Sequence, residues 1–144
     1  IKKLLEIDGL ELPWAPGKRR MEQARLSWRT LTDETGVTTD DIDRRVVDYG
    51  YQSYFSSHHP RVIPEPFTPE PAETYSKADI DGYAETMAAI AAEARSDPEI
   101  VKTAPHNAAL ASRIDESALN DENRLATTWR AWKKLNAAAP SEPS

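Results

Sequence analysis

The sequence contains no cysteine and no long apolar run, and these two absences exclude several kinds of protein. Without cysteine, the chain has no disulfide framework, no thiolate nucleophile and no zinc–thiolate site. No apolar segment approaches the roughly 18 residues that a membrane-spanning helix needs, and no signal-peptide pattern opens the sequence. We therefore expect a cytoplasmic protein without a membrane partner.

Positive charge is also in short supply. The 18 Lys and Arg residues are outnumbered by 24 Asp and Glu residues, so the net charge is −6. A nucleic-acid-binding protein places a basic face against the phosphates, and this balance argues against such a partner. Glycine-rich phosphate loops, G-x-S-x-G and H-E-x-x-H are missing as well. The 144 residues, of which 39% are hydrophobic, predict one domain with a modest core.

Helical spacing predicts two helices in the first third of the chain. Residues 18–35 are expected to form a helix that Gly36 ends. Its expected buried face consists of Met21, Ala24, Trp28 and Leu31. A second helix is expected to begin at a cap formed by Thr38 or Thr39 and to end at Gly50. Its expected buried residues are Ile42, Val46 and Tyr49.

A longer helix is predicted in the second half. Ser76 followed three residues later by Asp79 is an acidic variant of the capping box, which marks a helix start. The helix is expected to end at Asp97, and Pro98 then begins a short helical segment up to residue 103. The expected buried face of the long helix consists of Ile80, Tyr83, Met87, Ile90 and Ala94.

The remaining segments predict short strands and loosely attached ends. Residues 51–69 alternate aromatic or β-branched residues with polar ones, and their prolines restrict any strand to a short or edge position. Residues 1–17 are expected to form a strand or arm, and residues 117–136 a helix or docking arm. The small, proline-rich residues 137–144 are expected to be disordered.

Two groups of ionisable side chains are candidates for chemistry. His58 and His59 are neighbours, and neighbours in an extended segment point to opposite faces. A metal site would therefore need one of them together with Glu65, Glu70 or His106, and we favour a surface or interface pair without a metal. Glu70 and Glu73 suit either an acid–base pair or, as helix electrostatics favours, the N–H groups at a helix start.

Three segments carry motifs in an order typical of one enzyme family. They are RRMEQARLSWRTLTDETGVTTDDIDRRVVDYGY, EPAETYSKADIDGYAETMAAIAAEA and DPEIVKTAPHN. The first is similar to a helix–turn–helix ending in Asp-Tyr-Gly, and the second to a Glu-Pro-Thr-Glu-(Thr/Ser)-Glu-Ser-Lys stretch with the helix after it. The third resembles a segment ending in Asn-Ala-Pro-His. Residues 18–116 thus resemble the C-terminal domain of the glycine decarboxylase P-protein, the pyridoxal-phosphate (PLP) glycine dehydrogenase of the glycine cleavage system.

The resemblance implies an α+β fold, the small C-terminal domain of a fold-type I PLP enzyme, with helices packed on a short, mostly antiparallel sheet. In this family the Schiff-base lysine, the phosphate cup and the aspartate facing the pyridine nitrogen belong to the large domain. The resemblance therefore implies no catalytic residue and no cofactor-binding residue on this chain. It implies instead a separate small subunit of a hetero-oligomer, whose fold-type I partner carries PLP and whose substrate is a small amino acid, glycine or a relative of it.

One loop departs from the family pattern. The family commonly has His-(Ala/Pro)-Pro-Thr after Asp-Tyr-Gly-(Phe/Tyr), whereas here Gln52 replaces the histidine, or His58 takes over its role. Glutamine has no titratable nitrogen, so acid–base duty at this position would be lost. The expected substrate-pocket residues are Gln52, Tyr54, His58, His106 and Asn107. His106 alternatively serves only to bond a nearby carbonyl, and Tyr54 with Tyr51 alternatively belongs to the core or an interface.

Three hypotheses of different classes follow. The first is a small subunit that closes the substrate pocket of a split, PLP-dependent, glycine-decarboxylase-like enzyme. The second is a non-catalytic interaction or regulatory module that kept the fold and lost the chemistry, as the altered loop after Tyr51 suggests. A metal hydrolase built on His58, His59 and Glu65 ranks last.

Overall fold

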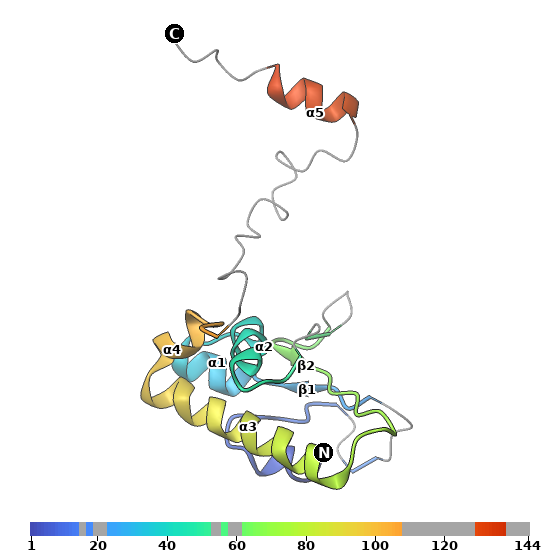
Figure 1. Cartoon of the computed structure of the whole chain (residues 1–144), viewed down its shortest axis with the longest axis vertical. Helices are drawn as coiled ribbons and strands as arrows, with labels where there is room; N and C mark the ends of the chain where they lie inside the picture. The colour runs from blue at the N-terminus through green and yellow to red at the C-terminus, as the bar shows by residue number, and fades with distance from the viewer. Residues whose placement is uncertain (15–16, 19–22, 53–55, 58–61, 108–128, 138–144) are drawn as a thin grey trace. The chain divides into compact units, whose positions relative to one another are not determined.

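Figure 1 shows a computed structural model of the chain, which describes residues 1–14, 17–18, 23–52, 56–57, 62–107 and 129–137. The chain divides into two compact units, Ile1–Arg113 and Ile114–Ser144. Within the described ranges, every helix is too short or too polar to cross a bilayer. The elements of the first unit, in chain order, are the 3-10 helix η1 (Leu4–Glu6), β1 (Leu26–Ser27), α1 (Arg29–Thr35), α2 (Thr39–Asp48), β2 (Pro66–Phe67), α3 (Lys77–Ser96) and α4 (Pro98–Lys102). The second unit contains α5 (Trp129–Asn136).

Helices α2 and α3 begin at the predicted caps. The hydroxyl of Thr38 accepts a hydrogen bond from the backbone of Asp41, and the Asp41 carboxylate accepts one from the backbone of Thr38. Ser76 and Asp79 form the same reciprocal pair at the start of α3. Each pair satisfies N–H groups that have no partner inside the helix. The predicted capping box of Ser76 and Asp79 is thus confirmed, and of the two threonines expected to cap α2 it is Thr38 that does so. Pro98 likewise begins α4 at its first turn, as predicted.

The first predicted helix is wrong over its N-terminal half. Helix α1 begins at Arg29, and Leu26 and Ser27 before it form the strand β1. Leu26 and Ser27 pair antiparallel with Phe67 and Pro66, and the backbone of Ser27 also exchanges two hydrogen bonds of 2.9 Å with Glu11. This pairing satisfies the backbone of β1 with partners far away in sequence, which a local periodicity cannot reveal. Met21 lies outside the described residues.

The core of the first unit lies where α3 packs against α1, α2, α4 and η1 (Figure 1). Six large side chains are completely or almost completely buried there: Leu26, Trp28, Leu31, Ile42, Met87 and Ile90. The ring of Trp28 packs against Phe67 of β2 with centroids 5.9 Å apart, so the strand pair is tied into the helical core. The short antiparallel sheet with helices packed on it confirms the predicted α+β class.

Two residues predicted to be buried lie at the surface. Ile80 is 44% exposed, because it lies in the first turn of α3 and the buried residues of this helix begin only at Ala84. Tyr49 is 38% exposed, because it follows the end of α2 and directs its hydroxyl to a carboxylate of α3. The other predicted core residues of α3 include Met87, Ile90 and Ala94, and all three are buried.

The second unit is described only at α5 and the residue that follows it. The indole rings of Trp129 and Trp132 stack 4.5 Å apart and nearly parallel, and both side chains are largely exposed. Lys133 lies 5.9 Å from the centroid of the Trp129 ring. Residues 117–128 of the expected helix or docking arm and residues 138–144 of the expected disordered tail lie outside the described ranges.

Candidate functional site

A cluster of charged side chains joins the end of α2 to α3. Arg45 directs Nε and Nη2 to the two carboxylate oxygens of Glu93, both at 2.9 Å, and Nη1 to Oδ2 of Asp48 at 2.8 Å. The hydroxyl of Tyr49 donates to Oε1 of Glu93 at 2.7 Å. We call these four residues (Arg45, Asp48, Tyr49 and Glu93) the Asp48 cluster. The paired contact with Glu93 fixes the orientation of the guanidinium as well as its distance.

Asp48 extends this cluster to the segment after α4. Its Oδ1 accepts hydrogen bonds from the backbone N–H groups of His106 and Asn107, each at 2.7 Å. The Asn107 side chain donates to the backbone carbonyl of Asp48 at 3.4 Å. The Asp48 side chain is only 2% exposed. A buried carboxylate with charged and backbone donors on both oxygens is a fixed point, so the His106–Asn107 backbone is fastened to the end of α2.

The His106 ring is held by a second contact. Its Nε2 lies 2.9 Å from the carbonyl oxygen of Ile100 and 3.5 Å from the Thr103 hydroxyl. Because a carbonyl oxygen only accepts, Nε2 carries the hydrogen, and in the neutral ring Nδ1 is then an acceptor. The ring thus makes the contact with a nearby carbonyl that the sequence suggested, while His106 and Asn107 both remain exposed.

The hydrogen bonds of the cluster favour its charged forms. Burial opposes ionisation of Asp48, but the N–H of Asn107, the Arg45 guanidinium and the N–H of His106 together outweigh it and lower its pKa below the ordinary 3.8. The hydrogen bond from Arg45 lowers the pKa of Glu93 despite partial burial, and the bond to Glu93 raises the pKa of Arg45. Burial, aided by the Glu93 carboxylate, raises the pKa of Tyr49. At neutral pH Arg45, Asp48 and Glu93 are therefore charged, whereas the Tyr49 hydroxyl keeps its proton.

The structure brings together only part of the predicted pocket. His106 and Asn107 lie side by side on the Asp48 carboxylate. Gln52 is exposed, and in the part of the chain that the structure describes no hydrogen bond joins it to either of them. Tyr54 and His58 lie outside the described residues. Tyr51 packs edge-on against Tyr83 with centroids 5.3 Å apart, so it belongs to the edge of the core.

The glutamates of the proline-rich stretch have other roles than those predicted. Helix α3 is capped by Ser76 and Asp79, so the expectation that Glu70 and Glu73 satisfy its first N–H groups is wrong. Glu70 instead accepts a hydrogen bond from the side chain of Gln23. The stretch before Ser76 is not helical, which leaves both carboxylates too far along the chain from the helix start.

The described members of the possible metal sites are also engaged elsewhere. Glu65 accepts a hydrogen bond of 2.7 Å from the backbone N–H of Thr39, at the first residue of α2. Among the residues that the structure describes, no group of three or more His, Asp or Glu side chains is placed to hold a metal ion. His58 and His59 lie outside this part of the chain.

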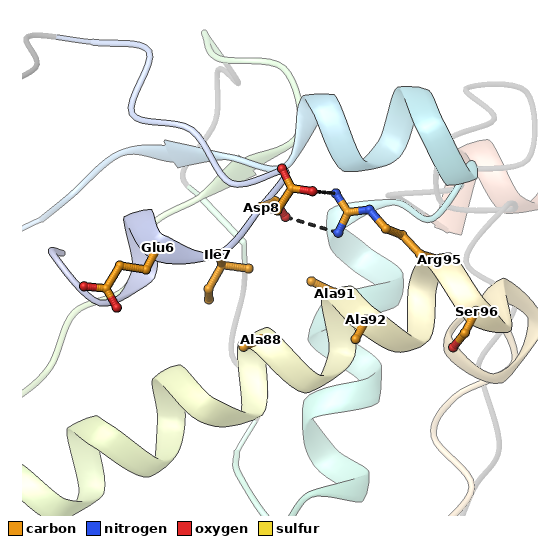
Figure 2. Close-up of a pocket in the computed structure, with 8 residues that line it drawn as sticks. All are labelled: Glu6, Ile7, Asp8, Ala88, Ala91, Ala92, Arg95 and Ser96. Atoms are coloured by element: carbon orange, nitrogen blue, oxygen red, sulfur yellow. Dashed lines mark hydrogen bonds and ion pairs between the residues drawn. The ribbon is translucent and has the colours of Figure 1, made fainter.

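A shallow cavity of about 600 Å³ lies between η1 and α3. Figure 2 shows its alanine floor on α3 and Arg95 reaching across to Asp8. The lining residues are Glu6, Ile7, Asp8, Ala88, Ala91, Ala92, Arg95 and Ser96. Arg95 is the one cation among them, and it is paired with Asp8 at 3.1 Å and with Glu34 at 3.0 Å.

These surroundings do not suit PLP. The cofactor needs a lysine for its Schiff base and free donors for its phosphate. The cavity is lined by no lysine, and its arginine already has two carboxylate partners. Of the lysines whose surroundings are described, Lys102 is half-buried and paired with Glu99, and the others are exposed. The described residues therefore offer PLP no site of their own.

The Asp48 cluster was not predicted from the sequence. Arg45 and Asp48 are three residues apart on α2, a spacing that places them on one helix face and is visible in the sequence. Glu93 is 48 residues beyond Arg45, and His106 is 58 residues beyond Asp48. One signal was available: Asp48, Glu93 and His106 each lie in one of the three segments that carry the family motifs.

Comparison with known proteins gives a consistent result. A family model described as "Glycine dehydrogenase, C-terminal domain" matches residues 19–111. The chain is 35% identical over 134 residues to a probable glycine dehydrogenase (decarboxylating) subunit 2 from Pyrococcus abyssi, and 36% identical over 135 residues to the protein of that name from Thermococcus gammatolerans. Each alignment covers 93% of this chain and 26% of the relative.

A bacterial protein of the same name, from Thioalkalivibrio sulfidiphilus, is 34% identical over 131 residues, which are 91% of this chain and 25% of the relative. The chain thus spans about a quarter of the length of the curated relatives it matches. The matched residues 19–111 include α1 to α4 and the Asp48 cluster with its His106–Asn107 segment. On this evidence the chain belongs to the glycine dehydrogenase C-terminal domain family.

Proposed function

We propose that this chain acts as the domain that completes the substrate pocket of a glycine dehydrogenase (decarboxylating) type of enzyme, whose PLP is carried by a fold-type I partner subunit. The observation that carries this proposal is the segment His106–Asn107, which is exposed and yet rigidly fastened to the buried Asp48. Exposed polar side chains on a fixed backbone are suited to orienting a small substrate.

The roles proposed for this chain are binding and positioning. His106 has one ring nitrogen bonded to the Ile100 carbonyl, which leaves Nδ1 to accept a hydrogen bond from an ammonium group such as that of glycine. Asn107 has its side-chain carbonyl as a further acceptor. Gln52 is suited to hydrogen bonding without proton transfer, because its amide does not titrate. Tyr54 and His58, which follow Gln52 closely in the sequence, complete the proposed set.

The partner is proposed from the cofactor. The described residues offer no PLP site, and the relatives are about four times as long as the matched part. The proposed substrate is glycine or another small amino acid, and the proposed assembly is a hetero-oligomer.

Co-expression with the proteins encoded beside this chain tests the proposal. A tag on this chain should recover a partner that shows the visible absorbance of protein-bound PLP, and the complex should release labelled carbon dioxide from carboxyl-labelled glycine. His106→Ala and Gln52→Ala should slow that release while leaving co-purification intact. A colourless chain that recovers no PLP protein would contradict the proposal.

The alternative is a non-catalytic interaction or regulatory module, which the replacement of the family histidine by Gln52 favours. It predicts the same complex with a different response. Substitution of Gln52, His106 or Asn107 would then leave the rate of glycine turnover unchanged, while loss of the whole chain would change the regulation or the amount of the partner. The rate of glycine turnover in the single-substitution variants therefore distinguishes the two hypotheses.

A further inference from the structure

We propose that Asp48 is the positioning residue of this pocket: its buried carboxylate fixes the backbone of His106 and Asn107, and thereby aims both side chains at the substrate. The inference rests on the proposed function for the role of the two aimed side chains. The fixing of the backbone by Asp48 is argued from the geometry of the Asp48 cluster alone. The hydrogen bonds of this cluster leave the Asp48 carboxylate no freedom to turn.

The two oxygens of Asp48 have separate tasks. Oδ2 receives the guanidinium of Arg45 at 2.8 Å, and Oδ1 receives the N–H groups of His106 and Asn107 at 2.7 Å each. Two successive backbone N–H groups that converge on one anionic oxygen form a concave anion site. Because Arg45 holds the other oxygen, rotation of the carboxylate would break contacts on both sides at once.

Arg45 is itself held from a different helix. Its two contacts with Glu93 of α3, both at 2.9 Å, make a planar paired contact that resists both sliding and tilting. The Tyr49 hydroxyl holds the same Glu93 at 2.7 Å, and the Arg45 guanidinium lies 5.4 Å from the centre of the Tyr49 ring. The position of Asp48 is thus set by α2 and α3 together, two helices of the packed core.

The aimed side chains then have little freedom of their own. The His106 backbone is fixed by Asp48 and its ring by the carbonyl of Ile100, so ring and backbone are held from opposite ends. Asn107 is fixed by its N–H and, more weakly, by its side-chain amide at 3.4 Å from the Asp48 carbonyl. Loss of the Asp48 carboxylate charge should release both residues while the core stays folded.

Asp48→Asn is the sharpest variant, because it keeps the shape of the side chain and removes its charge. In the isolated full-length chain we expect the amide hydrogens of His106 and Asn107 to exchange with solvent on the order of ten times faster through local opening of this segment, whereas amides in the core of α3 should respond only to the change in global stability. Asp33→Asn is the matched control. Asp33 is also a carboxylate paired with an arginine on its own helix, but its side chain is 70% exposed and it should leave both amides unchanged.

In the complex with the PLP subunit, a positioning role predicts a loss in kcat/KM for glycine on the order of 10- to 100-fold. Co-purification and PLP absorbance should stay at the wild-type level, which a role in folding alone would not allow. Amides of His106 and Asn107 that exchange at the wild-type rate in Asp48→Asn would overturn the inference. So would wild-type kcat/KM in a variant whose two amides have become fast.

Failure of the proposed function has a different signature. A wild-type complex that never forms, or that never turns over glycine, would contradict the pocket and leave the exchange measurement on the isolated chain to decide whether Asp48 fixes the segment. If Asp48→Asn then makes both amides exchange faster in the isolated chain, Asp48 fixes the backbone of His106 and Asn107 even though the pocket is contradicted.

Discussion

At the scale of single residues, the hydrogen bonds of the Asp48 cluster hold a buried carboxylate in one orientation. A carboxylate that is 2% exposed would be costly on its own, but three donors outweigh the burial and keep it ionised. Removing one partner of such a group leaves the others unsatisfied, which costs more than the hydrogen bond contributes. Variants of Asp48 should therefore affect stability in a way that depends on pH.

The folded-state pKa values of Asp48 and Glu93 lie below their ordinary values of 3.8 and 4.5. Their contribution to stability is thus present above these ordinary values and is lost as the pH falls through the lowered ones. In urea unfolding at neutral pH, Asp48→Asn should be less stable than wild type by about 1–3 kcal/mol. That difference should shrink progressively as the pH falls from 3.8 through the lowered pKa at which the folded wild-type carboxylate becomes protonated. A difference of the same size at every pH would contradict the electrostatic account, and Asp33→Asn again serves as the control.

Substitutions at two glycines with positive φ distinguish the stability cost of backbone strain from that of steric crowding. Gly9 has φ +86°, and a Cβ there would lie 2.9 Å from Nη2 of Arg95 and 3.0 Å from Cβ of Leu31. Gly50 has φ +84° with no atom within 4 Å of such a Cβ. Gly50→Ala should therefore cost about 1–2 kcal/mol for the left-handed backbone alone, and Gly9→Ala clearly more. Thermal unfolding compares the stability of the two variants. Equal losses of stability would contradict this expectation, because the turn at Gly9 could then shift without disturbing α1 or α3.

At the scale of elements, the helix starts of this domain are set locally. The cap of α3 is made by Ser76 and Asp79, three residues apart, and nothing distant is needed. Ser76→Ala should lower the free energy of unfolding by about 1 kcal/mol, because the N–H of Asp79 loses its acceptor. Ser76→Thr keeps the oxygen and should recover most of that loss in the same denaturant measurement. A fully stable alanine variant would mean that the first turn of α3 is frayed in solution.

Features that depend on residues close together in the chain are the ones that the sequence could predict. The caps of α2 and α3, the proline that begins α4 and the buried position of Trp28 were all correctly predicted from residues a few positions apart. The strand Leu26–Ser27 was mistaken for helix, because its partners Phe67 and Glu11 lie elsewhere in the chain and the spacing of Ala24, Trp28 and Leu31 also fits a helix.

The candidate site follows the same rule. His106 was predicted as a pocket residue from its match to a family motif, and Asn107 from its proximity to that motif. The contact of His106 with a nearby carbonyl was among the alternatives considered. Their anchor was not identified, because Asp48 and Glu93 meet only after α2, α3 and the segment after α4 have packed. Packing, rather than local pattern, creates this site.

Helix α5 is an element with a different composition from the rest of the chain. Its eight residues include three cationic residues and no acidic one, in a chain of net charge −6, and its two tryptophans are largely exposed. We expect α5 to contact a carboxylate-bearing surface of the PLP subunit, with Trp129 and Trp132 as anchors. Trp129→Ala with Trp132→Ala should weaken co-purification in a salt-dependent manner and leave the unfolding of the first unit unchanged. Undiminished recovery of the partner would remove this assignment.

At the scale of the whole molecule, the chain matches about a quarter of relatives that are named as subunits of glycine dehydrogenase. The unit Ile1–Arg113 has its own core, and its family match ends within that unit at residue 111. Its described surfaces hold a fixed polar segment and a shallow, alanine-floored cavity, but no arrangement suited to PLP. We therefore propose that this domain completes a site in an assembly rather than containing a PLP site of its own.

The most direct test is reconstitution with the purified PLP subunit. The rate of carbon dioxide release from carboxyl-labelled glycine is measured for that subunit alone, with the wild-type chain, and with the His106→Ala chain. The account predicts that release depends on the wild-type chain, saturates at a fixed ratio of the two proteins, and falls strongly with His106→Ala although binding persists. A PLP subunit that is equally active with and without this chain would contradict it.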